Sequence, residues 1–600
     1  MAEQVAYLQH HDGISGTSKY KVMDQLEVLD EKLTNELNEG ILRDVFSDEF
    51  PLGTANPLFT CHLDRPCKVP PSLKGDVYLK IINTDGSPQR DPIVIEMPVG
   101  VFYVPDCPHE FNCFCIEGDC PCKLYLYKPL YAYTAVRLRL ADPTAVKVNR
   151  LSTMPFNDQF NHNKTHLHIK HDGKDYFIGY KRVTAKPTQR NYAHLSRYGT
   201  QQTRGFQIRP GKYALGNDPN TAKDFTQVKG ISWLKTERYT FLLVSWKRHM
   251  MKTLVSIPSL RPNEWKVETI TATEGYHLSD LYFEVITPIK NEKRFVTDSN
   301  GWLTMNRELF KHEDYEAHFS PEKFDDLDGN SYPATAFTYI KDSNNKVSVN
   351  LERPQGVVAY REGTIWVNFD RLSEDDGKWV YESAYRSEYQ KYTHTITVDN
   401  HNYNERKIQR RYDQPLLIQG NSISPTTRVE DTEVDYVTRN EWNSIGNIEN
   451  IKFTVRPFND STTVLRVYNM HDEEDVTVGL YAERRSPLLT TYYGRTVGFN
   501  KIEETSMGAN MNYGQFLNNK WNWKSVVDLG KENHIFNKVM RENITLSPLE
   551  IRTFLITDLK FADECIKPSE LTFNKMEIRY EVDTSKPAPT REAITLRVEQ

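Results

Sequence analysis

Short hydrophobic runs with a two-residue repeat fill most of the chain and constrain its fold more than any other feature. Clear examples are Tyr239–Trp246, Lys346–Leu351, Gly363–Phe369 and Thr463–Tyr468. Such alternation is typical of strands that bury one face. Polar, turn-rich segments separate the runs, and almost no long helical pattern interrupts them over residues 146–560. We therefore expect a mainly β protein in which this region forms large stacked β-sandwich domains.

A smaller β-rich unit is expected ahead of that region, over residues 58–145. Val77–Ile82 and Ile93–Met97 read as strands joined by the turn-rich residues 83–88, and Val99–Val104 and Lys123–Leu140 continue the pattern. Residues 561–600 are expected to form a C-terminal β tail, with a strand-like run at Met576–Val582. Because 600 residues exceed what one hydrophobic core supports, three or more domains are expected.

The first fifty residues follow a different, helical pattern. Val22, Leu26, Leu29, Leu33 and Leu37 recur every three or four residues and form one apolar stripe. Thr17 or Ser18 suits the N-cap, and Gly40 suits the position after the last turn. Since one amphipathic helix is not stable alone, we expect residues 1–50 to contribute a loop and a helix to a helix bundle. The stripe is expected to be exposed in the isolated chain.

Two imidazoles and a carboxylate, on His10, His11 and Asp12, stand together just before this helix. The glycines that follow allow a tight backbone turn, so these side chains could face a shared pocket. Two interpretations stay open on the residues alone. The loop is either a solvated connection with an N-cap, or part of a site that lacks the further ligands zinc requires.

Charge and hydropathy exclude some classes of partner. The net charge of −6 gives no reason to expect nucleic acid or an anionic membrane as partner. No apolar run approaches the ~18 residues of a membrane-spanning helix. Residues 1–20 also lack the apolar core of a signal peptide.

The eight cysteines are unevenly placed along the chain. Five of them lie within sixteen residues, and either a zinc tetrad of Cys113, Cys115, Cys120 and Cys122 or disulfides would account for them. The one-residue spacers are shorter than those of common zinc knuckles, so disulfides are favoured in a secreted chain. Three bridges could then form among Cys107, Cys113, Cys115, Cys120, Cys122 and Cys565. Glycosylation sequons at Asn163, Asn459 and Asn543 fit the same route.

A second histidine group occurs in the β region, at His166, His168, His171 and Asp172. A His-x-His pair can bind metal from one face of a strand, but it is also common on solvated strands. We expect a structural role for this group.

The string His10–Thr17 resembles the His-His-Asp motif of glycoside hydrolase family 38, the retaining α-mannosidases, with Gly13 in place of alanine. Further stretches resemble the family in the same order along the chain. They are Arg294–Gly301, Glu352–Gly356, Arg371–Lys378 and Asn543–Leu555. Such an ordered series is more specific than any single motif, whereas residues 61–290 resemble the family weakly.

The resemblance implies a set of site residues. In the family, two histidines and two aspartates bind one Zn²⁺, and by the match His11 is a zinc ligand. Asp12 would accept hydrogen bonds from sugar hydroxyls, and Arg371 would reach toward the substrate, although Asp370 and Lys378 depart from the family pattern. A close cysteine pair at this point of lysosomal mannosidases implies a Cys61–Cys67 disulfide. The family's nucleophile and acid/base precede the histidine motif, so no catalytic residue is assigned in this chain.

The resemblance therefore implies the C-terminal part of a zinc-dependent retaining α-mannosidase that hydrolyses terminal α-mannose of N-glycans in the lysosome or outside the cell. Met1 is not expected to be the natural start, and the chain alone should be nearly inactive without a partner N-terminal catalytic half. The alternative is a non-catalytic, carbohydrate-binding β-sandwich module. Homo-oligomer formation is left open.

Overall fold

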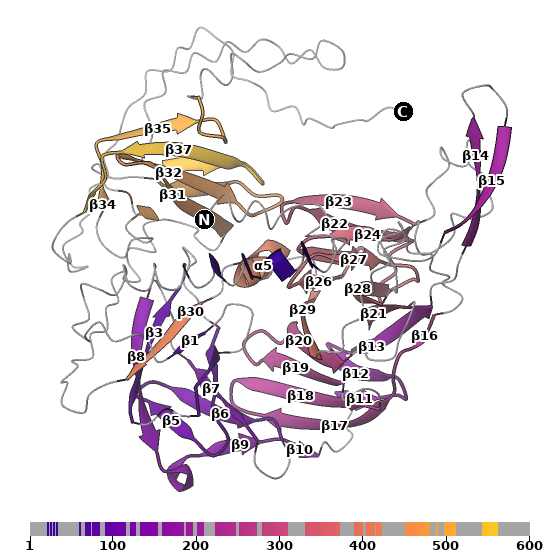
Figure 1. Ribbon diagram of the computed structural model, residues 1–600, viewed down its shortest axis with the longest axis horizontal. Coiled ribbons are helices and arrows are strands. Elements are labelled where there is room, and N and C mark those ends of the chain that lie inside the picture. Colours follow the sequence, from indigo (N-terminus) through magenta and orange to yellow (C-terminus); the bar gives the residue numbers. More distant parts are fainter. Residues whose placement is uncertain are drawn as a thin grey trace.

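The computed structural model describes most residues from Phe59 to Phe561 and part of a helix at 21–36. It does not describe 1–20, 37–58, 84–90, 209–221, 310–329, 373–388, 423–449, 512–542, 562–600 and some shorter stretches. The protein is mainly β, as predicted (Figure 1). Three groups of sheets surround one helix, α5 (Glu405–Asp413), that lies near the centre of the molecule (Figure 1).

A sandwich of two large sheets fills the middle of the chain. The ten-stranded sheet has the order β10 (Ser152–Thr153), β17 (Val228–Lys235), β18 (Tyr239–Trp246), β19 (Lys252–Pro258), β20 (Glu264–Ala272), β29 (Tyr389–Asp399), β26 (Lys346–Leu351), β25 (Phe337–Lys341), β22 (Arg294–Ser299) and β23 (Leu303–Glu308). The eight-stranded sheet has the order β11 (Phe160–His162), β12 (His166–His171), β13 (Lys174–Thr184), β21 (Ser279–Ile286), β28 (Thr364–Leu372), β27 (Gln355–Val358) and β24 (Tyr332–Ala334), with β16 (Lys223–Asp224) beside β13.

Large aromatic residues fill the space between these sheets. Trp265, Tyr180 and Phe283 belong to one continuous core, and each is no more than 2% exposed. The buried Tyr180 hydroxyl keeps hydrogen-bond partners, because it lies 2.8 Å from Thr253 Oγ1 and 2.5 Å from Thr269 Oγ1. This polar contact avoids the free-energy cost of an unpaired hydroxyl in the core.

Two five-stranded sheets form the smaller unit and enclose a separate core. One has the order β1 (Phe59–Cys61), β30 (Leu417–Ser422), β3 (Val77–Ile82), β8 (Tyr133–Ala141) and β5 (Phe102–Pro105). The other has the order β2 (Cys67–Lys68), β4 (Ile93–Glu96), β7 (Cys122–Leu126), β6 (His109–Cys113) and β9 (Val148–Arg150), and a short 3₁₀ helix covers Pro143–Ala145. The strand β30 comes from far downstream and lies between β1 and β3 (Figure 1).

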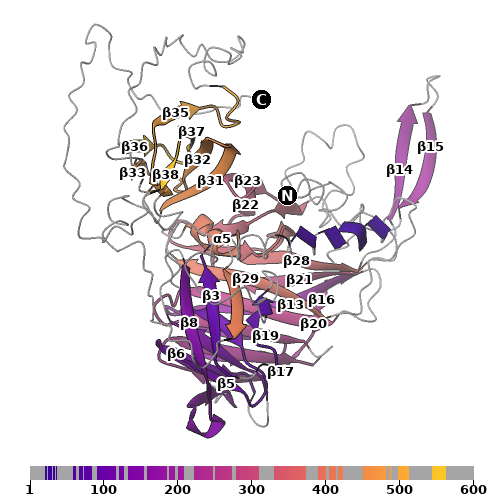
Figure 2. The same ribbon diagram turned by 60° about the vertical axis from the view of Figure 1, so that its left-hand side comes forward.

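A third group of strands follows the sandwich. A four-stranded sheet contains β31 (Ile451–Asn459), β32 (Thr462–Asn469), β37 (Ile551–Thr557) and β35 (Lys501–Thr505). Two strand pairs accompany it: β33 (Val476–Gly479) with β36 (Asn543–Leu546), and β34 (Val497–Gly498) with β38 (Lys560–Phe561). A long hairpin of β14 (Thr188–Leu195) and β15 (Gln201–Ile208) projects from the other side of the molecule (Figures 1 and 2).

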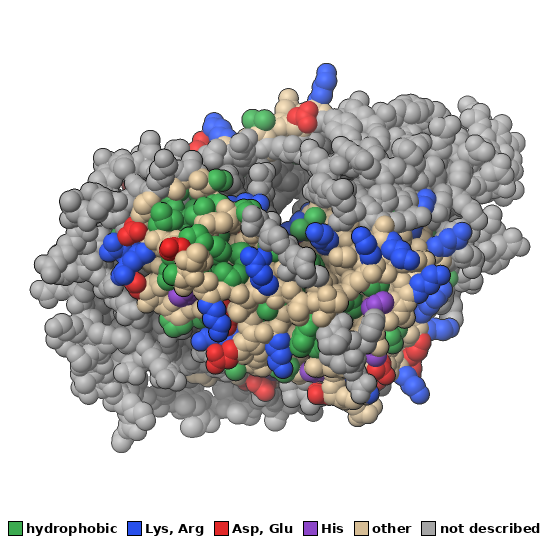
Figure 3. Space-filling model, turned by 90° about the horizontal axis from the view of Figure 1, so that it is seen from below, with side chains coloured by type: hydrophobic (Ala, Val, Ile, Leu, Met, Phe, Trp, Pro, Cys, Tyr) green, Lys and Arg blue, Asp and Glu red, His purple; other side chains and the backbone are tan. Residues whose placement is uncertain are grey.

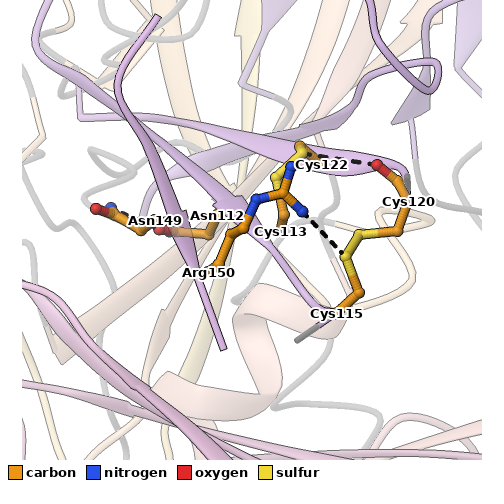
Figure 4. The surroundings of a disulfide bond; sticks show 7 residues. All are labelled: Asn112, Cys113, Cys115, Cys120, Cys122, Asn149 and Arg150. Carbon is orange, nitrogen blue, oxygen red and sulfur yellow. Dashed lines mark hydrogen bonds between the residues drawn. A yellow bond between two sulfur atoms is a disulfide. The ribbon is translucent and has the colours of Figure 1, made fainter. Parts of the chain in front are cut away.

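Disulfides close the loops of the smaller unit, as the favoured interpretation predicted. Cys61 is bonded to Cys67, and the crowded region forms Cys113–Cys122 and Cys115–Cys120 bridges. The first of these two joins directly paired positions of β6 and β7, and Arg150 Nη1 lies 3.4 Å from Cys115 Sγ (Figure 4). The zinc tetrad is therefore wrong, since a cystine sulfur is not a thiolate ligand. Cys107 belongs to none of these bridges, and Cys565 lies outside the described residues.

The N-terminal helix, at 21–36, only partly follows the expectation of an exposed stripe. Val22 is 41% exposed, but Leu33 of the same stripe is only 6% exposed. The exposed-stripe prediction is thus wrong at Leu33, which is buried within this chain. Whether the helix belongs to a bundle stays a prediction.

Candidate functional site

The residues predicted to bind metal or substrate lie mostly outside the described part of the structure. His11 and Asp12 are outside the described residues, as is Lys378. Arg371 falls in β28, directly across from Asp280 of β21, and its side chain is not described. Their roles therefore remain predictions from the family resemblance.

Among the described residues, one group has the side chains of a metal site: His166, Asp224 and Glu284, whose ligand atoms lie within 4.8 Å of one another. They come from β12, β16 and β21. The strand β13 lies between these three and pairs with each of them. Gly179 of β13 is directly opposite His166, and a Cβ at that position would overlap the imidazole ring. Glycine at 179 thus makes room for the buried histidine.

A lysine completes this group and satisfies its carboxylates. Lys181 Nζ lies 2.6 Å from Asp224 Oδ1 and 3.4 Å from Glu284 Oε2. His166 Nε2 is 2.7 Å from the same Glu284 oxygen, and Trp366 Nε1 donates to Glu284 Oε1 at 2.8 Å. The Glu284 side chain is only 2% exposed, so these donors offset the cost of burying its charge.

This geometry fits an internal ion-pair network better than a metal centre. Ligands of one zinc ion surround it at about 2.0–2.1 Å, and a protonated amine cannot join them. Here the Lys181 ammonium already lies against both carboxylates, and the 2.7 Å separation of His166 from Glu284 is a hydrogen-bond length. The three donors could hold a metal ion only after Lys181 moved away. This group therefore does not fit the family's zinc.

The other two histidines of the sequence cluster are engaged elsewhere. His168 Nε2 lies 2.8 Å from Asp175 Oδ1, and its ring stacks on Phe177 at 4.7 Å. His171 Nε2 lies 2.9 Å from Asn263 Oδ1. The structure does not bring these histidines together with His166 as a metal site.

The family-like motif Arg294–Gly301 forms a hairpin. Asn300 and Gly301 have φ values of 55° and 68°, and Trp302 N donates to Ser299 O at 3.0 Å. Positive φ at both positions suits the tight hairpin turn that Asn-Gly favours. The Asn300–Gly301 pair therefore forms a hairpin turn.

The motif Glu352–Gly356 contacts the sandwich core through Gln355, at the start of β27. Gln355 Oε1 lies 2.9 Å from Nε2 of the buried His394, whose ring stacks on Phe283 at 4.6 Å. Burial, together with the nearby Arg353 cation, lowers the pKa of His394 to about 3. The imidazole is therefore neutral at physiological pH, and Nε2–H donates to Gln355.

The surface agrees with the expected secretory route. The sequon residues Asn163, Asn459 and Asn543 are all exposed, as a glycan would require. In the described part of the chain, no helix has the length and apolar character needed to cross a membrane. Seen from below, Lys and Arg side chains are spread over the face together with a smaller number of Asp and Glu side chains (Figure 3).

Comparisons with known proteins point to one class of enzyme. The chain is 31% identical over 120 residues to human lysosomal alpha-mannosidase and 30% identical over 121 residues to the cat protein of the same name. These matches cover 20% of this chain but only 11% and 12% of the relatives' lengths. No family model matches the chain.

Two solved structures from Enterococcus faecalis are also similar. An alpha-mannosidase shows 12% identity and a TM-score of 0.42, covering 80% of this chain and 56% of its own. A protein in glycosyl hydrolase family 38 shows 11% identity and a TM-score of 0.47, covering 91% of this chain and 64% of its own. The sequence matches agree with the resemblance drawn from the motifs: over about a fifth of its length, this chain is similar to lysosomal alpha-mannosidases.

Proposed function

We propose that this chain is the β-rich part of a zinc-dependent α-mannosidase that acts on terminal α-mannose of N-glycans. The observation that carries the proposal is the ordered series of family motifs, beginning at His11, in a chain whose sequence relatives are lysosomal alpha-mannosidases. The disulfides and exposed sequon residues support a lysosomal or secreted location.

In this proposal His11 holds Zn²⁺ together with ligands from a second segment, and Asp12 accepts hydrogen bonds from mannose hydroxyls. The second segment also supplies the nucleophile and the acid/base carboxyl of the retaining mechanism. When bound, the zinc would grip sugar hydroxyls and help to distort the ring. Arg371 would add a contact from β28.

The test is reconstitution. We expect co-expression with a candidate N-terminal half to produce hydrolysis of an aryl α-mannoside that neither part shows alone. A His11→Ala variant should abolish this gain and lower bound zinc, because a ligand is lost. A His168→Ala variant should keep both, because that ring contacts Asp175 and Phe177 within the sandwich and is not expected to bind zinc.

Two results would contradict the proposal. One is the absence of any gain over the separate parts. The other is mannose binding by this chain alone that survives both chelation and His11→Ala, which would favour the carbohydrate-binding module instead.

A further inference from the structure

An open cleft of about 970 Å³ lies where two neighbouring strands stop pairing. The strands β22 and β25 pair only at Val296–Tyr339 and Thr297–Thr338. Beyond Val296, residues Lys290–Phe295 form one side of the cleft, and the end of β25 with the following turn, Lys341–Asn344, forms another. The cleft is therefore built into the edge of the ten-stranded sheet.

Among the charged side chains that line this cleft and form no ion pair, cations outnumber acids. Lys290 and Lys341 line it, and neither ammonium forms an ion pair in the described structure. Three acids line the cleft: Glu292 forms no ion pair in the described structure, and the other two are already engaged. Asp342 accepts hydrogen bonds from the backbone N–H groups of residues 290, 344 and 345. Burial acts to raise the pKa of Asp342, but these hydrogen bonds hold it below its usual range. Glu308 pairs with Arg294, with 4.0 Å between Oε2 and Nε.

Arg307 is the best-positioned cation of the cleft. Its Nε donates to Thr297 Oγ1 at 3.1 Å, and its guanidinium lies over the Tyr332 ring at 4.5 Å. These two contacts fix the plane of the guanidinium. Its terminal Nη groups have no protein partner within the described residues. A planar fork of free donors that is held in place beforehand suits a two-oxygen anion, because little side-chain entropy is lost on binding.

We propose that this cleft binds an oxyanion, the carboxylate or phosphate ester of an acidic ligand, with Arg307 as the anchoring residue. Lys290 and Lys341 add long-range attraction from the two walls. The hydroxyl of Tyr339 and the amide of Asn306 also line the cleft and can bond neutral hydroxyls of the same ligand. An acidic glycan combines both features; this last assignment rests on the proposed glycosidase function, whereas the anion site does not.

Titration calorimetry of the full chain tests the anion site with three probes: inorganic phosphate, glucuronate and methyl α-mannoside. We expect at least one of the two anions to bind with a dissociation constant of about 1 mM or below, weakening as salt is added. The comparison of phosphate with glucuronate decides which oxyanion fits better. Methyl α-mannoside should bind at least tenfold more weakly than the better anion.

Variants locate the site. Arg307→Gln should weaken anion binding at least tenfold, and Lys341→Gln, an exposed change that leaves the fold intact, should weaken it several-fold. The matched control Arg456→Gln, an exposed residue of β31, should bind as the unchanged protein does. No anion binding, equal binding by Arg307→Gln, or equal binding of the neutral sugar would overturn the proposal. Since none of these probes requires catalysis, failure of the mannosidase reconstitution would leave the result standing.

Discussion

At the scale of single residues, Asp298 explains what one family-like motif does. Its carboxylate is only 3% exposed and accepts hydrogen bonds from the backbone N–H groups of Gly301, Thr335, Ala336 and Phe337, at 2.6–3.0 Å. The Thr335 hydroxyl donates to it as well. One side chain therefore ties the β22–β23 hairpin to the segment that begins β25.

We predict that Asp298→Asn destabilises the protein by about 2–4 kcal/mol, because an amide NH₂ would face backbone donors and leave some of them unpaired. Thermal or urea unfolding measures this loss. The control Asp175→Asn removes an exposed partner of His168 and should change stability by less than about 1 kcal/mol. An equal loss of stability in the two variants would show that the hydrogen bonds to Asp298 contribute little to the stability of the protein.

Protonation of His394 makes the stability of the core depend on pH. Its pKa is lowered to about 3 by burial and by Arg353, so the unfolded chain, with a pKa near 6.5, binds a proton more readily. Stability from this residue is therefore present above pH 6.5 and is lost as the pH falls toward 3. The loss between pH 6.5 and 4.5 should be about 2 kcal/mol.

His394→Gln should flatten the pH dependence over that interval, since an amide does not titrate, although its stability at pH 7 should be lower because the stack on Phe283 is lost. Melting temperatures measured from pH 7 to 4.5 give the slope. His162→Gln, a partly exposed histidine, is the control and should keep the steep slope. An unchanged slope in His394→Gln would assign the acid sensitivity to other groups.

Local chemistry could be predicted from sequence where neighbours in the chain are also neighbours in space. The Asn300–Gly301 turn and the Cys61–Cys67 bridge are of this kind. The network of Lys181, Asp224 and Glu284 could not be predicted, because its members lie 43 and 60 positions apart along the chain and no short motif joins them. The cleft around Arg307 could not be predicted from the sequence either, because it forms where the pairing of β22 with β25 ends.

At the scale of elements, the limits of individual strands could be predicted from the hydrophobic runs, but the partners of these strands did not follow sequence order. The runs 77–82, 239–246 and 346–351 are strands with the same limits in the structure. By contrast, β30 pairs with β3 across more than 330 residues. Hydrophobic alternation sets which face of a strand is buried, whereas the choice of neighbour depends on packing across the whole chain.

One residue, Trp302, joins three elements that are distant in sequence. Its indole Nε1 donates to Leu549 O at 3.0 Å, and its ring meets Tyr468 of β32 edge-on at 5.5 Å. Its carbonyl accepts from the guanidinium of Arg406, at the start of α5, whose Nε is 2.8 Å away. The hairpin, the helix and the C-terminal sheet thus share one contact point.

We predict that Trp302→Ala destabilises the protein by about 3–4 kcal/mol and increases protease cleavage after residue 450, because the C-terminal sheet loses its apolar anchor. Trp302→Phe keeps the ring but not the N–H donor, and should cost about 1–2 kcal/mol. Limited proteolysis followed by mass spectrometry measures the cleavage after residue 450 in both variants. Cleavage at the same rate in Trp302→Ala and in Trp233→Phe, a partly exposed tryptophan of β17, would contradict this anchoring role.

At the scale of the whole molecule, charged side chains connect the smaller unit to the sandwich. Glu268 of β20 lies 2.7 Å from Lys391 Nζ and 3.6 Å from Lys266 Nζ, and Lys123 of the smaller unit faces it as well. Burial alone would raise the pKa of Glu268, but these three cations hold it well below its usual range. The carboxylate thus stays ionised and neutralises lysines from both units.

We predict that Glu268→Gln destabilises the protein by about 2–4 kcal/mol at pH 7, because Lys123 and Lys391 would be left near the interface without their counter-charge. The difference from the unchanged protein should shrink as the pH falls below 4.5, where the unfolded chain binds the proton that native Glu268 excludes. Calorimetric unfolding at pH 7 and at pH 3.5 measures both parts. Glu237→Gln, at an exposed position, should be neutral at either pH. A loss of equal size at both pH values would mean that the shape of the Glu268 side chain, and not its charge, holds the two units together.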